Sequence, residues 1–236
     1  MTTDGQARYA IYFVPAADSD LYGFGSAMLG YDAYSGGDVP MPTEPGLDPR
    51  TWRKLTDEPR RYGFHATLKA PFRLADGCDE AQLVRAFCDF ANRGHSSIRI
   101  SPEIRLLGSF TAIVPREPSA PLAALADRCT TEFDAFRAPM PTEERERRTP
   151  GLNELQLGNL DRWGYPYVFT DFRFHMTLTG RLAPDQQEMM LSVLRRHFAR
   201  MCRDGPIAID RLGLFKQADA SARFRVLDHS PLTPSR

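Results

Sequence analysis

Two short segments of the chain alternate between apolar and polar residues, and they are nearly copies of each other. The first, Phe64–Lys69, reads Phe-His-Ala-Thr-Leu-Lys, and the second, Phe174–Thr179, reads Phe-His-Met-Thr-Leu-Thr. Alternation places every second residue on the same face of a β-strand. We therefore predict two strands, each with an apolar face turned to a core and a polar face free to line a cleft.

The polar face of each predicted strand carries a histidine and, two positions later, a threonine. The members of these faces are His65, Thr67 and Lys69 in the first copy and His175, Thr177 and Thr179 in the second. A lone His-x-Thr is a weak signal that arises often by chance. Two copies 110 residues apart in matching surroundings, in a chain with five histidines, favour a functional pair over coincidence.

The elements predicted around the two histidine strands repeat in the same order. The first half has strand 8–15, helix 18–31, histidine strand 62–74, helix 79–93 and strand 96–107. The second half opens with strand 109–116 and continues with helix 119–136, histidine strand 168–180, helix 184–202 and strands 206–215 and 221–228. This order predicts an α+β fold formed by one bilobal domain over residues 1–236, with antiparallel sheets and helices packed outside.

The two lobes are expected to span approximately residues 1–107 and 108–236, with strands exchanged between them. A pseudo-twofold axis relating the lobes would bring the two histidine strands together at a shared cleft. Two segments lack a regular pattern. The proline-rich residues 34–59 are interpreted as a lid over the site or a disordered surface loop. Residues 138–151 contain a run of charges, Glu143–Arg148, that is interpreted as solvated surface.

The charge balance narrows the class of partner. Lysine and arginine together number 30, as do aspartate and glutamate, so the formal net charge is zero. Strong affinity for long nucleic acid or an anionic membrane requires accumulated positive charge, so neither is expected as the main partner.

No apolar run approaches the ~18 residues that span a bilayer, and the N-terminus has no signal-peptide pattern. The four cysteines lack C-x-x-C spacing. We expect a cytoplasmic monomer with reduced thiols and a small phosphorylated substrate.

A pair of histidines suits the opening of a phosphodiester without a metal or other cofactor. One imidazole can take a proton from attacking water while the other protonates the departing alkoxide, because an unperturbed histidine pKa of ~6.5 lies near neutral pH. Thr67 and Thr177 are expected to donate hydrogen bonds to the non-bridging phosphate oxygens, and Lys69 to add positive charge. The sequence leaves open which histidine is the acid.

Residues next to the motifs are further candidates for substrate contacts. Tyr62, Arg60 and Arg61 directly precede the first motif, where they could stack on the substrate or bind a second phosphate. Their interpretation as surface charges and an edge-strand tyrosine is about equally favoured. Thr179 takes the place of Lys69 in the second copy. Phe110 and Phe215 are predicted to be core residues.

The paired motifs, the duplicated order of elements and the length resemble the two-histidine (2H) phosphoesterases, which include cyclic phosphodiesterases and RNA ligase-like proteins. Residues Pro59–Phe72, Pro-Arg-Arg-Tyr-Gly-Phe-His-Ala-Thr-Leu-Lys-Ala-Pro-Phe, resemble the branch often encoded beside carbon–phosphorus lyase genes of phosphonate utilisation. The resemblance covers essentially the whole chain. It implies the duplicated fold and metal-independent hydrolysis of a cyclic or activated phosphodiester, of the 2′,3′-cyclic nucleotide or sugar phosphate type.

Three alternative functions are weighed against this one. A metal enzyme needs at least three suitable protein ligands, and the sequence has no H-x-H, H-E-x-x-H or aspartate-rich cluster. A binding protein for a phosphorylated metabolite or an RNA end would keep the same contacts without turnover. A ligase would run the reaction in reverse, although zero net charge counts against a long RNA substrate.

Overall fold

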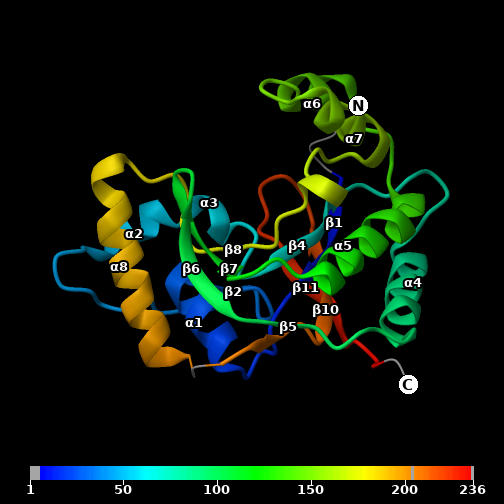
Figure 1. Ribbon diagram of the computed structural model, residues 1–236. Helices are drawn as coiled ribbons and strands as arrows, with labels where there is room; N and C mark the ends of the chain where they lie inside the picture. The colour runs from blue at the N-terminus through cyan, green and yellow to red at the C-terminus, as the bar shows by residue number, and fades with distance from the viewer. Residues whose placement is uncertain (1–5, 203–204, 235–236) are drawn as a thin grey trace.

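The computed structural model describes residues 6–202 and 205–234, and its centre is a seven-stranded antiparallel sheet with the order β11-β10-β1-β4-β8-β7-β6 (Figure 1). These strands are β1 (Arg8–Phe13), β4 (Ala66–Phe72), β6 (Pro102–Leu107), β7 (Phe110–Pro115), β8 (Met176–Thr177), β10 (Arg211–Gln217) and β11 (Arg225–Pro231). Two small sheets pair β2 (Tyr31–Asp32) with β3 (Gly37–Asp38) and β5 (Arg99–Ile100) with β9 (Ile207–Ala208). The predicted α+β class with antiparallel strands is confirmed.

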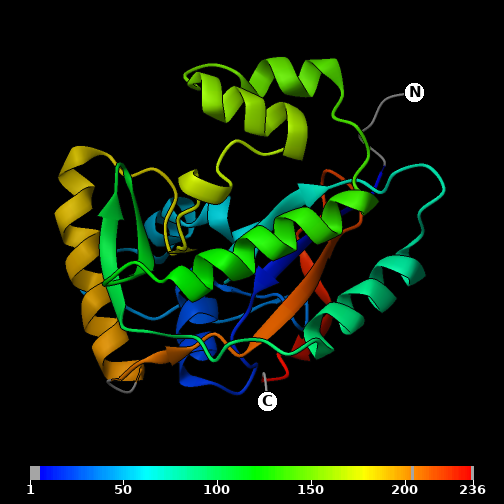
Figure 2. The ribbon, with the colours of Figure 1, turned by 45° about the vertical axis from the view of Figure 1, so that its right-hand side comes forward.

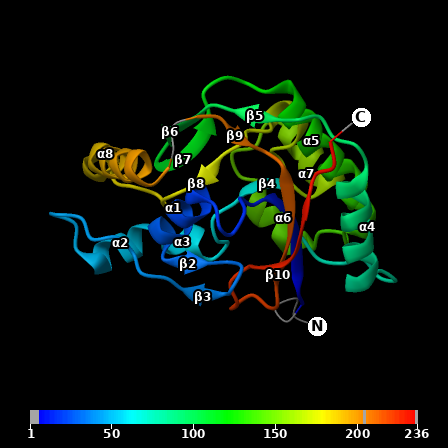
Figure 3. The same ribbon diagram turned by 90° about the horizontal axis from the view of Figure 1, so that it is seen from below.

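Helices cover the sheet from outside. They are α1 (Asp20–Leu29), α2 (Pro49–Leu55), α3 (Asp57–Arg60), α4 (Glu80–Asn92), α5 (Ala120–Glu132), α6 (Thr142–Arg148), α7 (Glu154–Trp163) and α8 (Pro184–Met201), with 3-10 turns η2 (Phe133–Phe136) and η3 (Phe169–Asp171). Seen from below, α8 lies outside β6 and β7 at one end, and α4 lies beyond β10 at the other (Figure 3). None of the helices in the described part of the chain is long and apolar enough to cross a membrane.

The centre of the sheet contains the internal repeat. The two histidine strands, β4 and β8, are direct antiparallel neighbours, and β1 flanks β4 as β7 flanks β8. The C-terminal strands β10 and β11 extend the β1 side, whereas β6 extends the β7 side. Strands from both halves of the chain are therefore combined in one sheet.

The apolar faces of both histidine strands lie in the core, as predicted. The buried residues are Phe64, Ala66 and Leu68 in the first copy and Phe174, Met176 and Leu178 in the second. Phe64 needs a glycine opposite it, because a Cβ atom built on Gly25 of α1 would lie 2.0 Å from the Phe64 ring. The second strand is shorter than predicted: only Met176–Thr177 is regular, and η3 occupies part of the remaining segment.

A β-bulge follows each threonine and ends the alternation there. Tyr12 pairs with Thr67 but Ile11 pairs with Lys69, so that Leu68 is an extra residue on β4. In the second copy, the backbone nitrogens of Leu178 and Thr179 both donate to the carbonyl oxygen of Thr111. A bulge turns the following side chains to the other face. The prediction that Lys69 shares the polar face of the histidines is therefore wrong.

The segment 34–59 was expected to be a lid or a disordered loop, and its regular elements overturn the second alternative. It contains β3, α2 and α3, and Glu44 fastens it to α8 through an ion pair with Arg196 and a 3.0 Å contact with the His197 ring. Of this segment only Glu58 and Pro59 line the cleft described below. Its proline content fits a chain that turns often.

A different segment overhangs the histidine strands. Residues 139–167, here called the cap, contain α6 and α7 and stand above the rest of the molecule (Figure 2). The sequence analysis interpreted 138–151 as surface and did not predict α7. A capping box at the start of α7, in which Asn153 and Gln156 satisfy each other's backbone nitrogens, was a local signal for that helix.

Candidate active site

The register of β4 and β8 brings the two motifs together. Ala66 pairs with Met176 in antiparallel fashion, which places His65 opposite Thr177 and Thr67 opposite His175. Because side chains alternate along a strand, all four polar groups lie on the same face of the sheet. They line one cleft of about 700 Å³.

Both imidazoles are oriented by the same backbone contact. His65 Nδ1 lies 2.8 Å from the carbonyl oxygen of Gly63, and His175 Nδ1 lies 2.7 Å from that of Arg173. A carbonyl oxygen only accepts hydrogen bonds, so each neutral ring carries its proton on Nδ1 and leaves Nε2 as the available base. Gly63 adopts φ 76°, and a Cβ there would lie 2.7 Å from that of Ala33. This turn therefore requires glycine.

The surroundings of His65 favour its neutral form. Its ring stacks on Tyr12 with centroids 3.8 Å apart and planes 25° from parallel. Burial lowers the pKa of His65 to about 4, with a smaller lowering effect from nearby His175, while the Gly63 carbonyl opposes the shift. The ring is therefore uncharged at neutral pH. Its Nε2 lies 3.4 Å from the hydroxyl of Thr67.

The His175 ring has a looser environment. It has no stacked tyrosine, and its aromatic neighbour is Phe110, whose ring is tilted with its centroid 5.8 Å away. Phe110 is only partly buried and lines the cleft, so its prediction as a core residue is wrong, whereas Phe215 is fully buried as predicted. The two histidines thus have equivalent backbones and different solvation.

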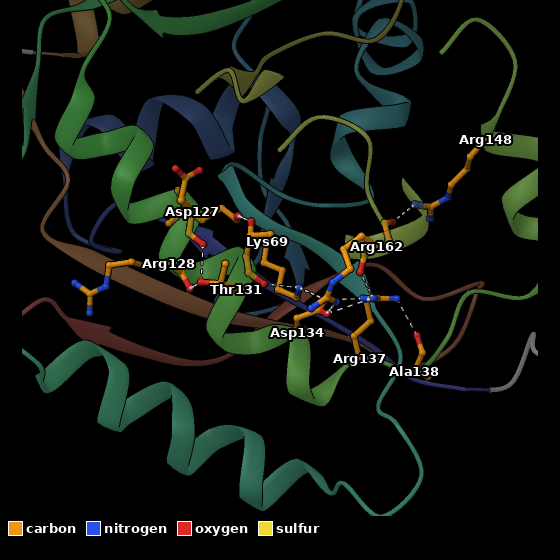
Figure 4. A network of polar contacts seen from close by, with 12 residues as sticks. Lys69, Asp127, Arg128, Thr131, Asp134, Arg137, Ala138, Arg148 and Arg162 are labelled. Atoms are coloured by element: carbon orange, nitrogen blue, oxygen red, sulfur yellow. Dashed lines mark hydrogen bonds and ion pairs between the residues drawn. The ribbon is translucent and has the colours of Figure 1, made fainter. Parts of the chain in front are cut away.

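Lys69 does not line the cleft, and its side chain points toward Asp134 (Figure 4). Its side chain is 3% exposed, and Nζ lies 3.1 Å from Asp134 Oδ1 and donates to the carbonyl oxygen of Thr130. Asp134 also accepts from Arg137 and Arg162. The physical reason is the bulge at Leu68, which directs Lys69 toward α5 and η2. Lys69 therefore ties the first histidine strand to the base of the cap.

Arg60 and Arg61, which were predicted to contact a substrate, both lie away from the cleft. Arg60 is buried and donates to the carbonyl oxygens of Leu29 and Arg53, so it stabilises the fold and is not available to a substrate. Arg61 is exposed, donates to the carbonyl oxygen of Ala220 and does not line the cleft. The prediction of substrate contacts by Arg60 and Arg61 is therefore not supported by their positions.

Thr179 and Tyr62 do line the cleft. The hydroxyl of Thr179 accepts a hydrogen bond from the backbone nitrogen of Thr111, and this bond holds the Thr179 side chain at the bulge. Tyr62 stacks on Phe224 at 5.2 Å, and its ring centroid lies 6.1 Å from that of His65. Tyr62 thus remains a candidate for substrate contact, while Thr179 mainly supports the backbone.

Several cleft residues were missed by sequence reasoning. They are Arg8, Tyr12, Arg148, Tyr165, Tyr167 and Arg181. Tyr12 lies in the first strand at a position that shares a face with apolar neighbours, so only the pairing of β1 with β4 reveals its contact with His65. Arg148 belongs to the charge run that was interpreted as surface, and only the position of the cap brings it to the cleft.

A second pocket of about 490 Å³ adjoins the cleft and shares Thr67, Phe110 and His175 with it. Its lining mixes aliphatic and aromatic side chains, and its charged groups are Asp127, Asp171 and Arg173. Asp127 Oδ1 and Asp171 Oδ2 are buried without a hydrogen-bond partner. Neither here nor elsewhere in the described ranges do three histidine, cysteine or acidic side chains gather closely enough to hold a metal ion.

Comparisons with curated proteins give relatives longer than this chain. A protein of Janthinobacterium sp. (strain Marseille), called ribose 1,5-bisphosphate phosphokinase PhnN, is 38% identical over 231 residues, covering 95% of this chain and 50% of its own length. A protein of the same name from Laribacter hongkongensis (strain HLHK9) is 34% identical over 226 residues, covering 93% and 50%. The chain spans about half the length of these relatives.

Solved structures give distant likenesses. They include E. coli LigT complexed with NADP+ (13% identity, TM-score 0.43, 97% of this chain and 98% of that one) and LigT complexed with 3′-AMP (13%, 0.41, 97% and 99%). At this level of similarity they carry no argument about the activity of this chain.

A family model described as "Protein of unknown function (DUF1045)" matches residues 67–225, which include the first threonine, the whole second motif and the cap. The duplicated antiparallel sheet agrees with the two-histidine phosphoesterase fold that the sequence resemblance implied. The chain belongs to the DUF1045 family.

Proposed function

We propose that this protein is a metal-independent phosphoesterase that hydrolyses a cyclic or otherwise activated phosphodiester. The observation that carries the proposal is the pairing of β4 with β8, which aligns two Nδ1-anchored histidines and two threonines on one face of one cleft. A structural role for these groups would not require two equivalent orientations at the floor of a cleft.

The proposed reaction uses the two histidines in opposite roles. Neutral His65, whose pKa is lowered to about 4 by burial, takes a proton from the attacking water through Nε2. The water oxygen bonds to phosphorus as the bond to the leaving oxygen breaks. Protonated His175 then gives its proton to the leaving alkoxide. Thr67 and Thr177 donate to the non-bridging oxygens, where negative charge is held in the transition state.

The substrate class in this proposal is a nucleotide or sugar cyclic phosphate, of the 2′,3′-cyclic type. A role in phosphonate utilisation is included because the Pro59–Phe72 run resembles the branch encoded beside carbon–phosphorus lyase genes. The kinase name of the curated relatives describes a different reaction and belongs to proteins about twice as long. We propose that the protein acts in the cytoplasm on small molecules.

A hydrolysis screen in excess chelator tests this proposal. Nucleoside 2′,3′-cyclic phosphates, ribose cyclic phosphates and ADP-ribose 1″,2″-cyclic phosphate are incubated with the protein and EDTA, and phosphorus NMR reports the position of the product phosphate. We expect one class to open to a single regioisomer. Tight binding without turnover would replace the proposal by a binding protein. Activity that requires an added divalent ion would replace it by a metal enzyme.

A further inference from the structure

The cleft carries more positive charge than a single phosphodiester requires. Its lining includes three arginines, Arg8, Arg148 and Arg181, against one carboxylate, that of Glu58. Arg181 follows the second histidine strand on the side of Glu58, since Glu58 packs beside Gly180. Arg8 and Arg148 lie toward the other end of β4, near Pro71 and Arg73. These two arginines have no role in the proposed hydrolysis.

Arg8 lies at the start of β1, and no carboxylate among the described residues pairs with it. Its Nε donates to the neutral side-chain oxygen of Gln217 at 2.7 Å, and its guanidinium lies 5.5 Å from the centroid of the Phe224 ring. Phe224 also stacks on Tyr62. One aromatic ring thus positions both a guanidinium and a cleft tyrosine, while the terminal nitrogens of Arg8 are left to bind something else.

Arg148 reaches the cleft from the opposite side, at the end of α6 in the cap. Its Nη2 lies 2.5 Å from Glu144 Oε1, and its Nη1 donates to the carbonyl oxygen of Gly164. The other oxygen of Glu144 pairs with Arg73 at 2.9 Å. One carboxylate is shared by two guanidiniums, so this trio retains a net positive charge. Glu144 therefore orients Arg148 without cancelling it.

Tyrosine hydroxyls complete this part of the cleft. Tyr12, Tyr62 and Tyr165 line it together with the two arginines. Burial raises the pKa of Tyr12, and it raises that of Tyr165 to about 12. Both hydroxyls therefore remain protonated at neutral pH and can donate hydrogen bonds. Guanidinium forks and neutral hydroxyl donors are groups that bind a phosphate dianion.

The adjoining pocket carries more acidic than basic groups. Its lining has two carboxylates, Asp127 and Asp171, against one arginine, Arg173, and one oxygen of each carboxylate is buried with no donor among the described residues. The cleft and the adjoining pocket share Thr67 and His175. A substrate with a second phosphate is therefore directed with that group toward Arg8 and Arg148.

We propose that Arg8 and Arg148 bind a second phosphate of the substrate, a phosphomonoester, while the histidine pair acts on its cyclic phosphodiester. This rests on the proposed function and narrows it to a sugar or nucleoside cyclic phosphate that carries an additional phosphomonoester. Such a group has a charge of about −1.5 to −2 at neutral pH, which suits two guanidiniums that line the same cleft. Arg148 would also link occupancy of the cleft to the position of the cap.

Binding measurements separate this inference from the question of turnover. The dissociation constants of adenosine 3′,5′-bisphosphate and 3′-AMP, and of ribose 1,5-bisphosphate and ribose 5-phosphate, are measured by calorimetry. Wild type is compared with Arg8→Gln, Arg148→Gln and Arg148→Lys, and the control is Arg105→Gln, which removes an exposed arginine that lines neither pocket. None of these ligands is a cyclic phosphate, so no catalysis is needed.

We expect at least one bisphosphate to bind about 10-fold or more tighter than its monophosphate, the scale of charged hydrogen bonds. Arg8→Gln and Arg148→Gln should each remove most of that advantage, Arg148→Lys should retain part of it, and Arg105→Gln should leave it unchanged. No advantage in either ligand pair, or an advantage that survives both glutamine variants, would overturn the inference. Tighter bisphosphate binding in a protein that opens no cyclic phosphate would support this subsite while refuting the proposed hydrolysis.

Discussion

The two histidine strands share a backbone and differ in what surrounds it. Both pair in one register, both anchor Nδ1 on the carbonyl two residues earlier, and both end in a bulge after the threonine. The ring of His65, however, stacks on Tyr12, whereas that of His175 only approaches Phe110 at a tilt. The two copies of the motif hold their histidine rings in the same orientation. Because the rings differ in their surroundings, one can act as the base and the other as the acid.

The residues that follow the two bulges, Lys69 and Thr179, also differ in what they contact. The first directs Lys69 into an ion pair with Asp134, and the second directs Thr179 to the backbone nitrogen of Thr111. Lys69 lies outside the cleft, whereas Thr179 still lines it with its hydroxyl bound to the backbone. The first copy uses the position to fasten the cap, while the second uses it to hold its own strand.

Among the substitutions considered, removal of either histidine should lower kcat the most. We expect His65→Ala and His175→Ala each to lower kcat by roughly 10²-fold or more, because each removes a positioned base or acid. The double variant should cost much less than the product of the two losses, since paired residues act as a unit. Steady-state kinetics on the substrate found in the screen measures this. Undiminished turnover in either single variant would show that the repeated histidines are not the catalysts.

The threonines test whether the two copies are equivalent at the phosphate. Thr67→Val and Thr177→Val each remove a donor and keep the shape, so we expect losses in kcat/KM of about 10- to 100-fold, similar for both. A matched control is Thr131→Val, since Thr131 is exposed on α5 and its hydroxyl bonds only to its own helix. A loss confined to one motif threonine would mean that the phosphate is held by one strand.

The Tyr12 stack can be broken to make the two histidines more alike. Tyr12→Leu should admit water to His65 and raise its pKa from about 4 toward the ordinary value of ~6.5. A base must be neutral, so activity is lost as pH falls through the pKa of His65. The acid limb of the kcat/KM profile should therefore move to higher pH. Tyr12→Phe retains the stack and should leave the limb in place; an unmoved limb in the leucine variant would contradict the assignment.

Lys69 should have the smallest effect on catalysis. Lys69→Met removes a buried partner of Asp134, which keeps Arg137 and Arg162, so we expect a loss of stability of about 1–3 kcal/mol by denaturant unfolding. The value of kcat should change less than about threefold, because Lys69 lies outside the cleft. A large loss of kcat in a stably folded variant would return Lys69 to the phosphate.

The sequence predicted the parts of the fold that follow from local patterns. The alternation around both motifs predicted the buried faces, and the duplicated order of elements predicted that the two histidine strands meet at one cleft. Their direct pairing within a single sheet was not predicted. The bulge after Thr67 was not visible, because nothing in the alternation before Leu68 signals an extra residue. The arginine side of the cleft was missed for another reason: Arg8 and Arg148 come together only through strand pairing and the position of the cap.

The central claim is that the backbone holds the two histidines alike while their surroundings make His65 the base. The protonation of His65 tests this claim most directly. Nitrogen-detected NMR of histidine-labelled protein, with His65→Gln used for assignment, reports both the pKa and the tautomer of each ring. The account predicts that His65 titrates near pH 4 and that His65 and His175, when neutral, both carry the proton on Nδ1. Titration of His65 near pH 6.5 or above, or a proton on its Nε2, would contradict its role as the base.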